Sequence, residues 1–233
     1  VDEVLGSDNH VVLPGFVNAH HHVGLTPLQL GSPDMPLELW FGTRLAARSV
    51  DLRLDTLYSA FEMVESGITT VQHLQGRLPA PLANMVAGAT ETLRAYQDLG
   101  IRVSYAHGIR DQNLLVYEAD QAFLARLPED LARDLAPMLA RQLAPLDDHF
   151  ALFDELRRRF AGDPRIAIQL APANLHWCSD AALERVREAC ERTGVPHHIH
   201  LLETQYQRAY AHTRAGVGAR EQLDRAGLLG PHC

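Results

Sequence analysis

Two histidine-rich segments far apart in the chain restrict the possible folds more than any other feature. The first, PGFVNAHHH, contains His20 and His22, and the second, HHIHLLE, contains His200 and Glu203. In the first segment an apolar run ends in two histidines that point to the same side of an extended backbone, because side chains alternate along a strand. The second is another short strand-like run that ends at a histidine, with a glutamate three residues later.

These residue types are suited to metal chemistry. Two imidazoles that converge at a strand end can bind one metal ion, and neutral imidazole suits a borderline metal such as zinc. A nearby carboxylate that is not a ligand can move protons for a metal-activated water. A lone histidine is more often a surface residue or a hydrogen-bonded core residue. Two strand-end motifs of matching chemistry favour a shared metal site instead.

The remainder of the chain passes repeatedly from strand-like to helix-like patterns. Strands are predicted at residues 15–19, 68–71, 101–105, 166–170 and 197–201. Helices are predicted at residues 37–65, 82–99, 131–160 (broken near Pro137 and Pro145), 181–192 and 218–226. Strands that alternate with helices imply βαβ units and a parallel α/β sheet. A doubly wound sheet also satisfies the pattern, but histidines on the first and fifth strands must meet at one metal, which favours a sheet curled into a barrel.

The two motifs carry a resemblance to a known family. PGFVNAHHH resembles the signature of the amidohydrolase superfamily, in which His-x-His closes the first barrel strand. His200 with Glu203 resembles the fifth-strand metal ligand and the proton-shuttling glutamate of its deaminase and chlorohydrolase branch. That branch includes cytosine, guanine and adenosine-analogue deaminases and triazine hydrolases. The resemblance runs from about Val11 to the last residue, and it implies a (β/α)8 TIM barrel of which this chain holds strands one to five.

The resemblance also implies parts that lie outside this sequence. In the family, a Gly-Pro turn like the one at Pro231 leads into a sixth strand that carries another histidine, and an eighth strand supplies a metal-binding aspartate. The family's N-terminal β-sandwich is reduced here to a few residues. We therefore interpret residues 1–10 as a remnant of that sandwich, residues 11–233 as the first five β/α units, and the chain as the middle of a longer protein.

By this resemblance, His20, His22 and His200 bind one divalent metal ion, which is zinc or, as an alternative, iron. Glu203 is then the catalytic proton shuttle. The competing interpretation is that Glu203 is a helix N-terminal carboxylate stabilised by the helix dipole.

The remaining histidines of the two motifs are assigned by strand alternation. His21 should point away from the metal, and His197 should point outward from the barrel. His198 should be a hydrogen-bonded interior residue that lies deeper in the barrel than the metal.

Polar and aromatic residues fall where strands two to four open into loops. Loops at the mouth of a barrel select the substrate, and planar side chains suit a flat heteroaromatic ring. The competing interpretation of each residue is a hydrogen bond that braces a loop. The substrate-binding candidates are His73, Arg110, Gln112, His176 and Trp177.

The implied activity is that of a metal-dependent hydrolase acting on carbon–nitrogen bonds other than peptide bonds. Activated water attacks an electron-poor ring carbon while Glu203 protonates the ring nitrogen and then the leaving group. Departure of ammonia would make the protein a deaminase, and departure of chloride from a triazine-like ring would make it a chlorohydrolase. A non-catalytic family member that keeps the fold for binding is the alternative from another class.

The net charge and the cysteine content restrict which partners and which cellular compartment can be expected. The 21 Lys+Arg against 29 Asp+Glu give a net charge of −8, which argues against nucleic acid or an anionic membrane as a partner. No apolar run approaches the roughly 18 residues that a membrane span needs. Three cysteines without framework spacing indicate a reducing, cytoplasmic setting. We expect a small heterocyclic substrate and a homo-oligomer, a dimer.

Overall fold

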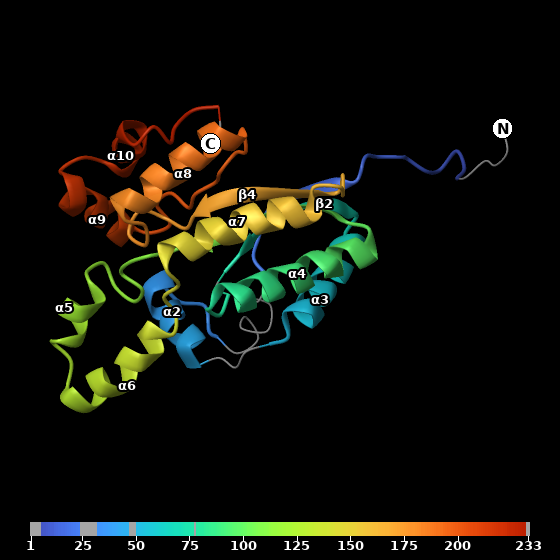
Figure 1. The fold of residues 1–233 in the computed structure, drawn as a ribbon. Helices are drawn as coiled ribbons and strands as arrows, with labels where there is room; N and C mark the ends of the chain where they lie inside the picture. Colours follow the sequence, from blue (N-terminus) through green and yellow to red (C-terminus); the bar gives the residue numbers. More distant parts are fainter. Residues whose placement is uncertain (1–5, 24–31, 47–49, 77, 232–233) are drawn as a thin grey trace.

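Four strands form the central sheet of the protein. The computed structural model describes residues 6–23, 32–46, 50–76 and 78–231 (Figure 1). The strands are β1 (Phe16–His21), β2 (Ile68–Gln75), β3 (Arg102–Ile109) and β4 (Ile166–Pro172). They are neighbours in chain order, and all three pairs are parallel. The predicted α/β class with a parallel sheet is confirmed.

Helices occupy the connections between the strands and the region after β4. They are α2 (Leu37–Ala46), α3 (Leu52–Glu65), α4 (Leu82–Leu99), α5 (Asp120–Leu124), α6 (Glu129–Ala140), α7 (Leu146–Phe160), α8 (Asp180–Thr193), α9 (Gln205–Ala215) and α10 (Ala219–Arg225). Figure 1 shows α5 and α6 projecting from the main body, and α8, α9 and α10 grouped at one end. None of the helices in the described residues is long and apolar enough to cross a membrane.

The two faces of the sheet differ in polarity. On one face Val71, Tyr105 and Ile168 are buried in a single apolar core with α3, α4, α7 and α8. On the other face Gln72 Nε2 donates to Gln169 Oε1 at 3.2 Å. Because successive side chains alternate, one strand supplies both surfaces. The helices therefore cover the apolar face, and the polar face is the inside of a partial barrel.

The prediction of a regular fifth strand at residues 197–201 is wrong. Residues 197–201 lie beside β4 in the parallel sense, but only one bridge forms, between Leu170 and His197. The next bond of a regular ladder would need an N–H from Pro172, which proline lacks. His200 N–H instead donates to Ala173 O at 3.3 Å, one residue further along. The ladder therefore loses its register, although His200 still lies next to the end of β4.

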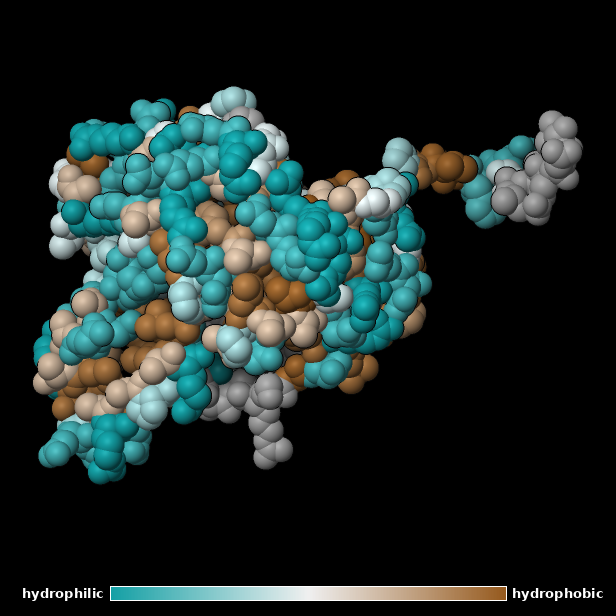
Figure 2. All heavy atoms as spheres, in the orientation of Figure 1, coloured by the Kyte–Doolittle hydropathy of each residue, from teal (hydrophilic) through white to brown (hydrophobic). Residues whose placement is uncertain are grey.

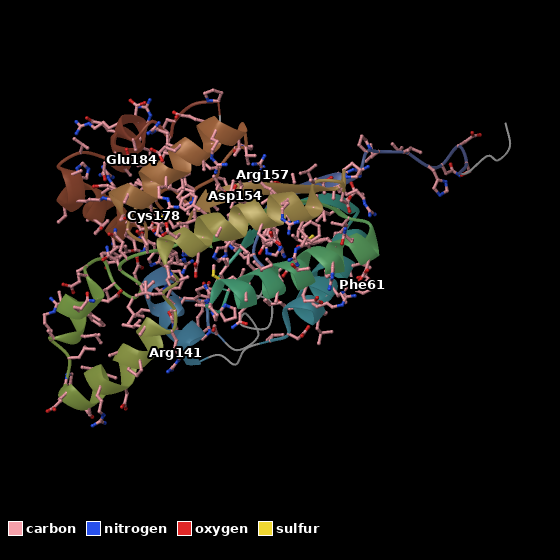
Figure 3. All side chains as sticks on the ribbon, viewed as in Figure 1. Phe61, Arg141, Asp154, Arg157, Cys178 and Glu184 are labelled. Atoms are coloured by element: carbon pink, nitrogen blue, oxygen red, sulfur yellow. The ribbon has the colours of Figure 1, made fainter. Side chains whose placement is uncertain are left out.

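The predicted helix at residues 37–65 is two helices, α2 and α3, and residues 47–49 between them lie outside the described residues. The start of α3 had a signal in the sequence, because Asp51 is an N-cap residue whose Oδ1 accepts from Leu54 N–H at 2.8 Å. Along this helix Met63 is buried against the core, whereas Phe61 is exposed on the outer side (Figure 3).

The predicted breaks in the helix at residues 131–160 are half right. Pro145 does separate two helices and is the residue before α7, but α6 continues through Pro137. Proline costs a helix the hydrogen bond of its own nitrogen, and here its carbonyl still accepts from Arg141 N–H at 3.2 Å. The helices α5 and α9 were not predicted from the sequence.

The segment before β1 extends away from the body (Figures 1 and 2). Residues 6–15 contain no helix or strand, and Val11, Val12 and Leu13 are exposed. Residues 1–5 of the predicted sandwich remnant lie outside the described residues. The division of the chain at residue 10 stays a prediction.

Gly15 is in close contact with β2, which leads to a stability prediction. A Cβ built on Gly15 would lie 2.2 Å from Thr69 Oγ1 and 2.8 Å from Thr69 Cβ. Thr69 is the residue skipped in the register between Phe16↔Ile68 and Val17↔Thr70. A change of threonine rotamer cannot remove a contact with its Cβ, so the backbone must shift.

We therefore expect Gly15→Ala to lower the free energy of unfolding by about 1–3 kcal/mol, the usual cost of overpacking. Gly162→Ala is the matched control, because a Cβ there meets nothing within 4 Å. Chemical denaturation of both variants measures the difference. Equal midpoints would show that Thr69 does not constrain the chain at Gly15.

Candidate metal centre and substrate pocket

Three histidine side chains converge at the carboxyl ends of the strands. His20 lies near the end of β1, His22 follows directly after that strand, and His200 lies beside the end of β4. The Nε2 atoms of His20 and His22 are 3.0 Å apart, those of His22 and His200 are 3.1 Å apart, and those of His20 and His200 are 3.3 Å apart. The predicted convergence of these residues is present, across 180 positions of sequence.

Backbone carbonyls fix the orientation of two of the rings. His22 Nδ1 lies 3.0 Å from Leu74 O, and His200 Nδ1 lies 2.8 Å from Ala173 O. A carbonyl only accepts hydrogen bonds, so both Nδ1 atoms carry the proton and both Nε2 atoms present a lone pair. Two lone pairs that face each other at 3.1 Å repel unless a cation lies between them. The two Nδ1 atoms are thus hydrogen-bonded as in metal sites, where the ring nitrogen that does not bind the metal donates to a nearby acceptor.

The spacing fits a tetrahedral metal. Zinc–nitrogen bonds of about 2.0–2.1 Å at the tetrahedral angle separate two ligand nitrogens by about 3.3–3.4 Å. The three Nε2 distances lie close to this value, and their three atoms form one face of such a tetrahedron. Burial, followed by the neighbouring His200 and His20, lowers the pKa of His22 to about 3. The ring is therefore neutral at pH 7, which is the form that binds metal.

The neighbouring histidines of the first motif and of β2 face the helices. His21 points away from the cluster as predicted, with its ring centroid 6.5 Å from that of His73. His73 was predicted to contact substrate, but the structure places it elsewhere: its ring is fully buried, and Nδ1 lies 3.0 Å from Tyr96 Oη on α4. Alternation explains this position, because His73 shares the helix-covered face of β2 with Val71.

The histidines before His200 lie as predicted. His198 Nδ1 is 2.7 Å from Gln72 Nε2, so His198 is a hydrogen-bonded residue inside the partial barrel. His197 points outward and is buried, with Nδ1 3.6 Å from Cys190 Sγ on α8.

A cavity of about 380 Å³ lies beside the histidine cluster. His22, His200 and Glu203 line it on one side. The other walls include Trp40, Phe41, Arg44, Arg110 and Trp177. The Arg110 guanidinium lies 3.7 Å from the Trp177 ring centroid, and the Phe41 and Trp177 rings meet edge to face at 5.0 Å. Two of the predicted substrate-binding residues, Arg110 and Trp177, therefore line this pocket.

The other two loop candidates lie outside this cavity. Gln112 Nε2 donates to the carbonyl oxygens of His176 at 3.1 Å and Cys178 at 3.2 Å, so it braces the loop after β4, which was the competing interpretation. His176 is buried behind Trp177, with the two ring centroids 4.4 Å apart. Burial, with a smaller effect of Arg110, lowers the pKa of His176 to about 3.

Glu203 lies at the pocket and directly before α9. Its side chain is exposed and accepts a hydrogen bond through Oε2 from Gln207 Nε2 at 3.0 Å. Thr204, the next residue, is the N-cap of α9. Its position is thus compatible with both predicted interpretations, the proton shuttle and the helix N-terminal carboxylate.

Part of the pocket wall was not found from the sequence. Trp40, Phe41 and Arg44 were not among the predicted substrate-binding residues. All three lie on α2, whose approach to the cavity depends on contacts far along the chain, such as Phe41 with Trp177. The adjacent aromatic pair in the first predicted helix was the available signal.

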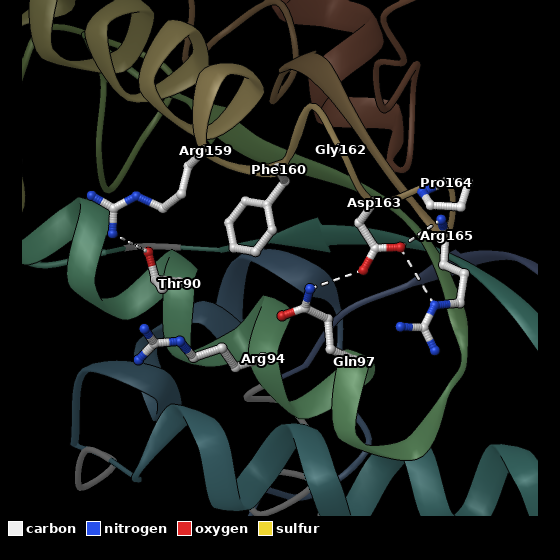
Figure 4. Close-up of a pocket in the computed structure, with 9 residues that line it drawn as sticks. All are labelled: Thr90, Arg94, Gln97, Arg159, Phe160, Gly162, Asp163, Pro164 and Arg165. Atoms are coloured by element: carbon white, nitrogen blue, oxygen red, sulfur yellow. Dashed lines mark hydrogen bonds and ion pairs between the residues drawn. The ribbon is translucent and has the colours of Figure 1, made fainter.

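A second hollow lies at the opposite ends of the strands, where β3 and β4 begin (Figure 4). Its polar groups contact one another: Arg159 Nη1 donates to Thr90 Oγ1 at 3.2 Å, and Gln97 Nε2 donates to Asp163 Oδ2 at 2.9 Å. The histidine cluster is at the other end of the sheet, so this hollow is separate from the candidate metal centre.

Comparisons with known proteins agree with the motifs. The model of the amidohydrolase family matches residues 11–231. A 5-methylthioadenosine/S-adenosylhomocysteine deaminase of Desulfitobacterium hafniense is 25% identical over 236 aligned positions, which cover 99% of this chain and 46% of that protein. A 5'-deoxyadenosine deaminase of Methanosarcina barkeri is 28% identical over 242 positions, covering 100% of this chain and 48% of the relative. The chain thus spans about half the length of the curated relatives it matches.

Solved structures show the same fold. A triazine hydrolase from Arthrobacter aurescens matches with a TM-score of 0.72 at 18% identity, over 94% of this chain and 47% of that one. An adenosine deaminase from Xanthomonas campestris with bound zinc matches with a TM-score of 0.66 at 24% identity, over 94% of this chain and 43% of that one. The sheet and its helices therefore have the fold of part of a (β/α)8 barrel.

Proposed function

Because the chain belongs to the amidohydrolase family, we propose that it forms the metal-binding part of a hydrolase that removes an amino group from a nitrogen heterocycle. The triangle of His20, His22 and His200 beside a pocket that contains Glu203 is the observation that carries this proposal. The nitrogen spacing and the carbonyl-fixed rings support a divalent ion as its occupant.

Each group has a role in the proposed reaction. A divalent ion held by the three histidines would lower the pKa of water toward 7 and so supply a nucleophile at neutral pH. Glu203 would take one proton from the water and pass it to the ring nitrogen, and it would then move the second proton, from the hydroxyl added to the ring carbon, to the departing amine. Trp177 and Phe41 would provide a flat apolar wall for the ring. Water and the aminated ring carbon are converted to a carbonyl and ammonia.

The relatives favour ammonia over chloride as the leaving group. The two relatives from Desulfitobacterium hafniense and Methanosarcina barkeri, which align along 99% and 100% of this chain, are named as deaminases of adenosine derivatives. One of the similar solved structures is an atrazine chlorohydrolase from Arthrobacter aurescens, which keeps dechlorination of a triazine-like ring as the second candidate. Zinc in the similar adenosine deaminase structure supports zinc over iron. A purely binding role is disfavoured because Glu203 lies at the pocket, where a scaffold has no need of a proton shuttle.

The test is a direct assay of the leaving group. Full-length protein, purified without added metal and analysed for metal content, is incubated with aminated purines and with a chlorinated triazine. We expect ammonia release from at least one aminated purine. Chloride release alone would favour the chlorohydrolase, and no release of either from metal-loaded protein would contradict the proposal. A dimer in a reducing cytoplasm is the setting we propose for the enzyme.

A further inference from the structure

We propose that Gln207 is the positioning residue that holds Glu203 for proton transfer, and that this role requires glutamine rather than glutamate. The inference rests on the proposed function, because it gives Glu203 a proton to move. Gln207 lies in the first turn of α9 and is 5% exposed. It lines a small hollow with His176, next to the main pocket.

One side chain holds both parts of Glu203. Gln207 Oε1 accepts from the backbone N–H of Glu203 at 3.0 Å, and Gln207 Nε2 donates to Glu203 Oε2 at 3.0 Å. Glu203 itself is exposed, so its rotamer is not fixed by packing. Its other oxygen, Oε1, accepts no hydrogen bond from the described residues and remains available for a proton. The amide thus fixes one carboxylate oxygen and leaves the second to react.

The pattern Thr204-x-x-Gln207 is a capping box with an altered target. Thr204 Oγ1 accepts from Gln207 N–H at 3.3 Å, as an N-cap residue does. In the usual capping box the third helical side chain bonds back to the N–H of the cap residue itself. Here it reaches one residue further, to Glu203. Helix capping alone would accept glutamate at this position equally well, but glutamate would face the Glu203 carboxylate with a like charge.

The backbone before Glu203 supports a constrained loop. Leu202 has a φ of 64°, in the left-handed region that a leucine rarely adopts. Such a conformation persists where the surroundings over-determine it, and functional sites are where it is common. Besides the bond from Gln207, a second contact holds the loop: Thr204 Oγ1 donates to Glu38 Oε1 on α2 at 2.7 Å. The segment is therefore fixed from α9 and from α2.

The experiment compares Gln207→Glu and Gln207→Met in the full-length, metal-loaded enzyme. We expect kcat to fall by about 10²-fold in both, the order of loss from a misplaced catalytic group, while KM changes by less than about threefold and metal content stays equal to wild type. Asp51→Ala is the matched control, because it removes the side-chain cap of α3 away from the pocket and should leave kcat unchanged. At equal metal content, wild-type kcat in Gln207→Met would overturn the positioning role, and wild-type kcat in Gln207→Glu would overturn the requirement for glutamine.

A double-mutant cycle supplies a second reading that a structural role would not reproduce. In a Glu203→Ala background, Gln207→Met should cause no further loss of kcat, because its effect passes through the missing carboxylate. A further loss of the full size would overturn the proposal. The same four proteins give a cycle in melting temperature, which needs no activity. Additive shifts in melting temperature would disprove the contact between Gln207 and Glu203. Coupled shifts in a protein that shows no turnover would mean that the contact exists and that the proposed function is wrong.

Discussion

Replacing His22 by alanine is expected to remove the metal ion and with it all metal-dependent turnover. His22 is the central member of the cluster: its Nε2 lies within 3.1 Å of both other Nε2 atoms, and its Nδ1–H is held by Leu74 O. Only two imidazoles of the described triangle would remain, and the ion would lose the ligand that lies closest to both of the others. Metal content should fall from about one ion per chain to near zero.

Elemental analysis of His22→Ala after purification without added metal measures this loss, together with the turnover rate at saturating substrate. His212→Ala is the control, because His212 is an exposed histidine on α9 outside the cluster. Metal content equal to that of the control would remove His22 from the ligand set.

Glu203→Gln is expected to separate chemistry from metal binding. Glutamine has nearly the same shape, and its carbonyl can still accept from Gln207 Nε2, so the side chain should stay in place. It cannot take a proton from water, and kcat should fall by about 10²–10⁴-fold with metal content unchanged. If Glu203 acted only as a helix N-terminal carboxylate, the substitution would cost about 1 kcal/mol of stability or less and leave kcat intact.

Both quantities are measured on the same preparations, with turnover expressed per bound metal ion. Equal turnover per ion in Glu203→Gln and wild type would exclude the proton shuttle. A loss of both metal and turnover would instead make Glu203 part of the metal centre.

The sequence predicted those features that follow from a two-residue period. Alternation correctly separated His21 from His20 and His22, and it placed His198 inside the barrel. The prediction that His73 contacts substrate relied on its place near a strand end and ignored side-chain alternation. Alternation puts His73 on the helix-covered face of the sheet.

Other features depend on properties that the pattern does not contain. The prediction of a regular fifth strand failed because of Pro172 on the neighbouring strand β4, and no signal for this lies in residues 197–201 themselves. The sequence of α9, QYQRAYAHTRA, contains no Leu, Ile, Val, Met or Phe, so its amphipathic period is weak. The contact of Glu38 with Thr204 joins residues 166 positions apart, and no local signal predicts it.

The position of the histidine cluster affects the whole chain as well as the pocket. His20 lies on β1, at one end of the strand order, and His200 lies beside β4, at the other end. An ion shared between them would act as a reversible cross-link that encloses 180 positions of chain in one loop. This loop contains β2, β3 and β4, so one ion restrains all four strands at once. The entropy cost of closing a loop in an unfolded chain grows only logarithmically with the length of the loop. Dissociation of the ion would then loosen the sheet as a unit, and slow amide exchange throughout the strands would depend on metal occupancy.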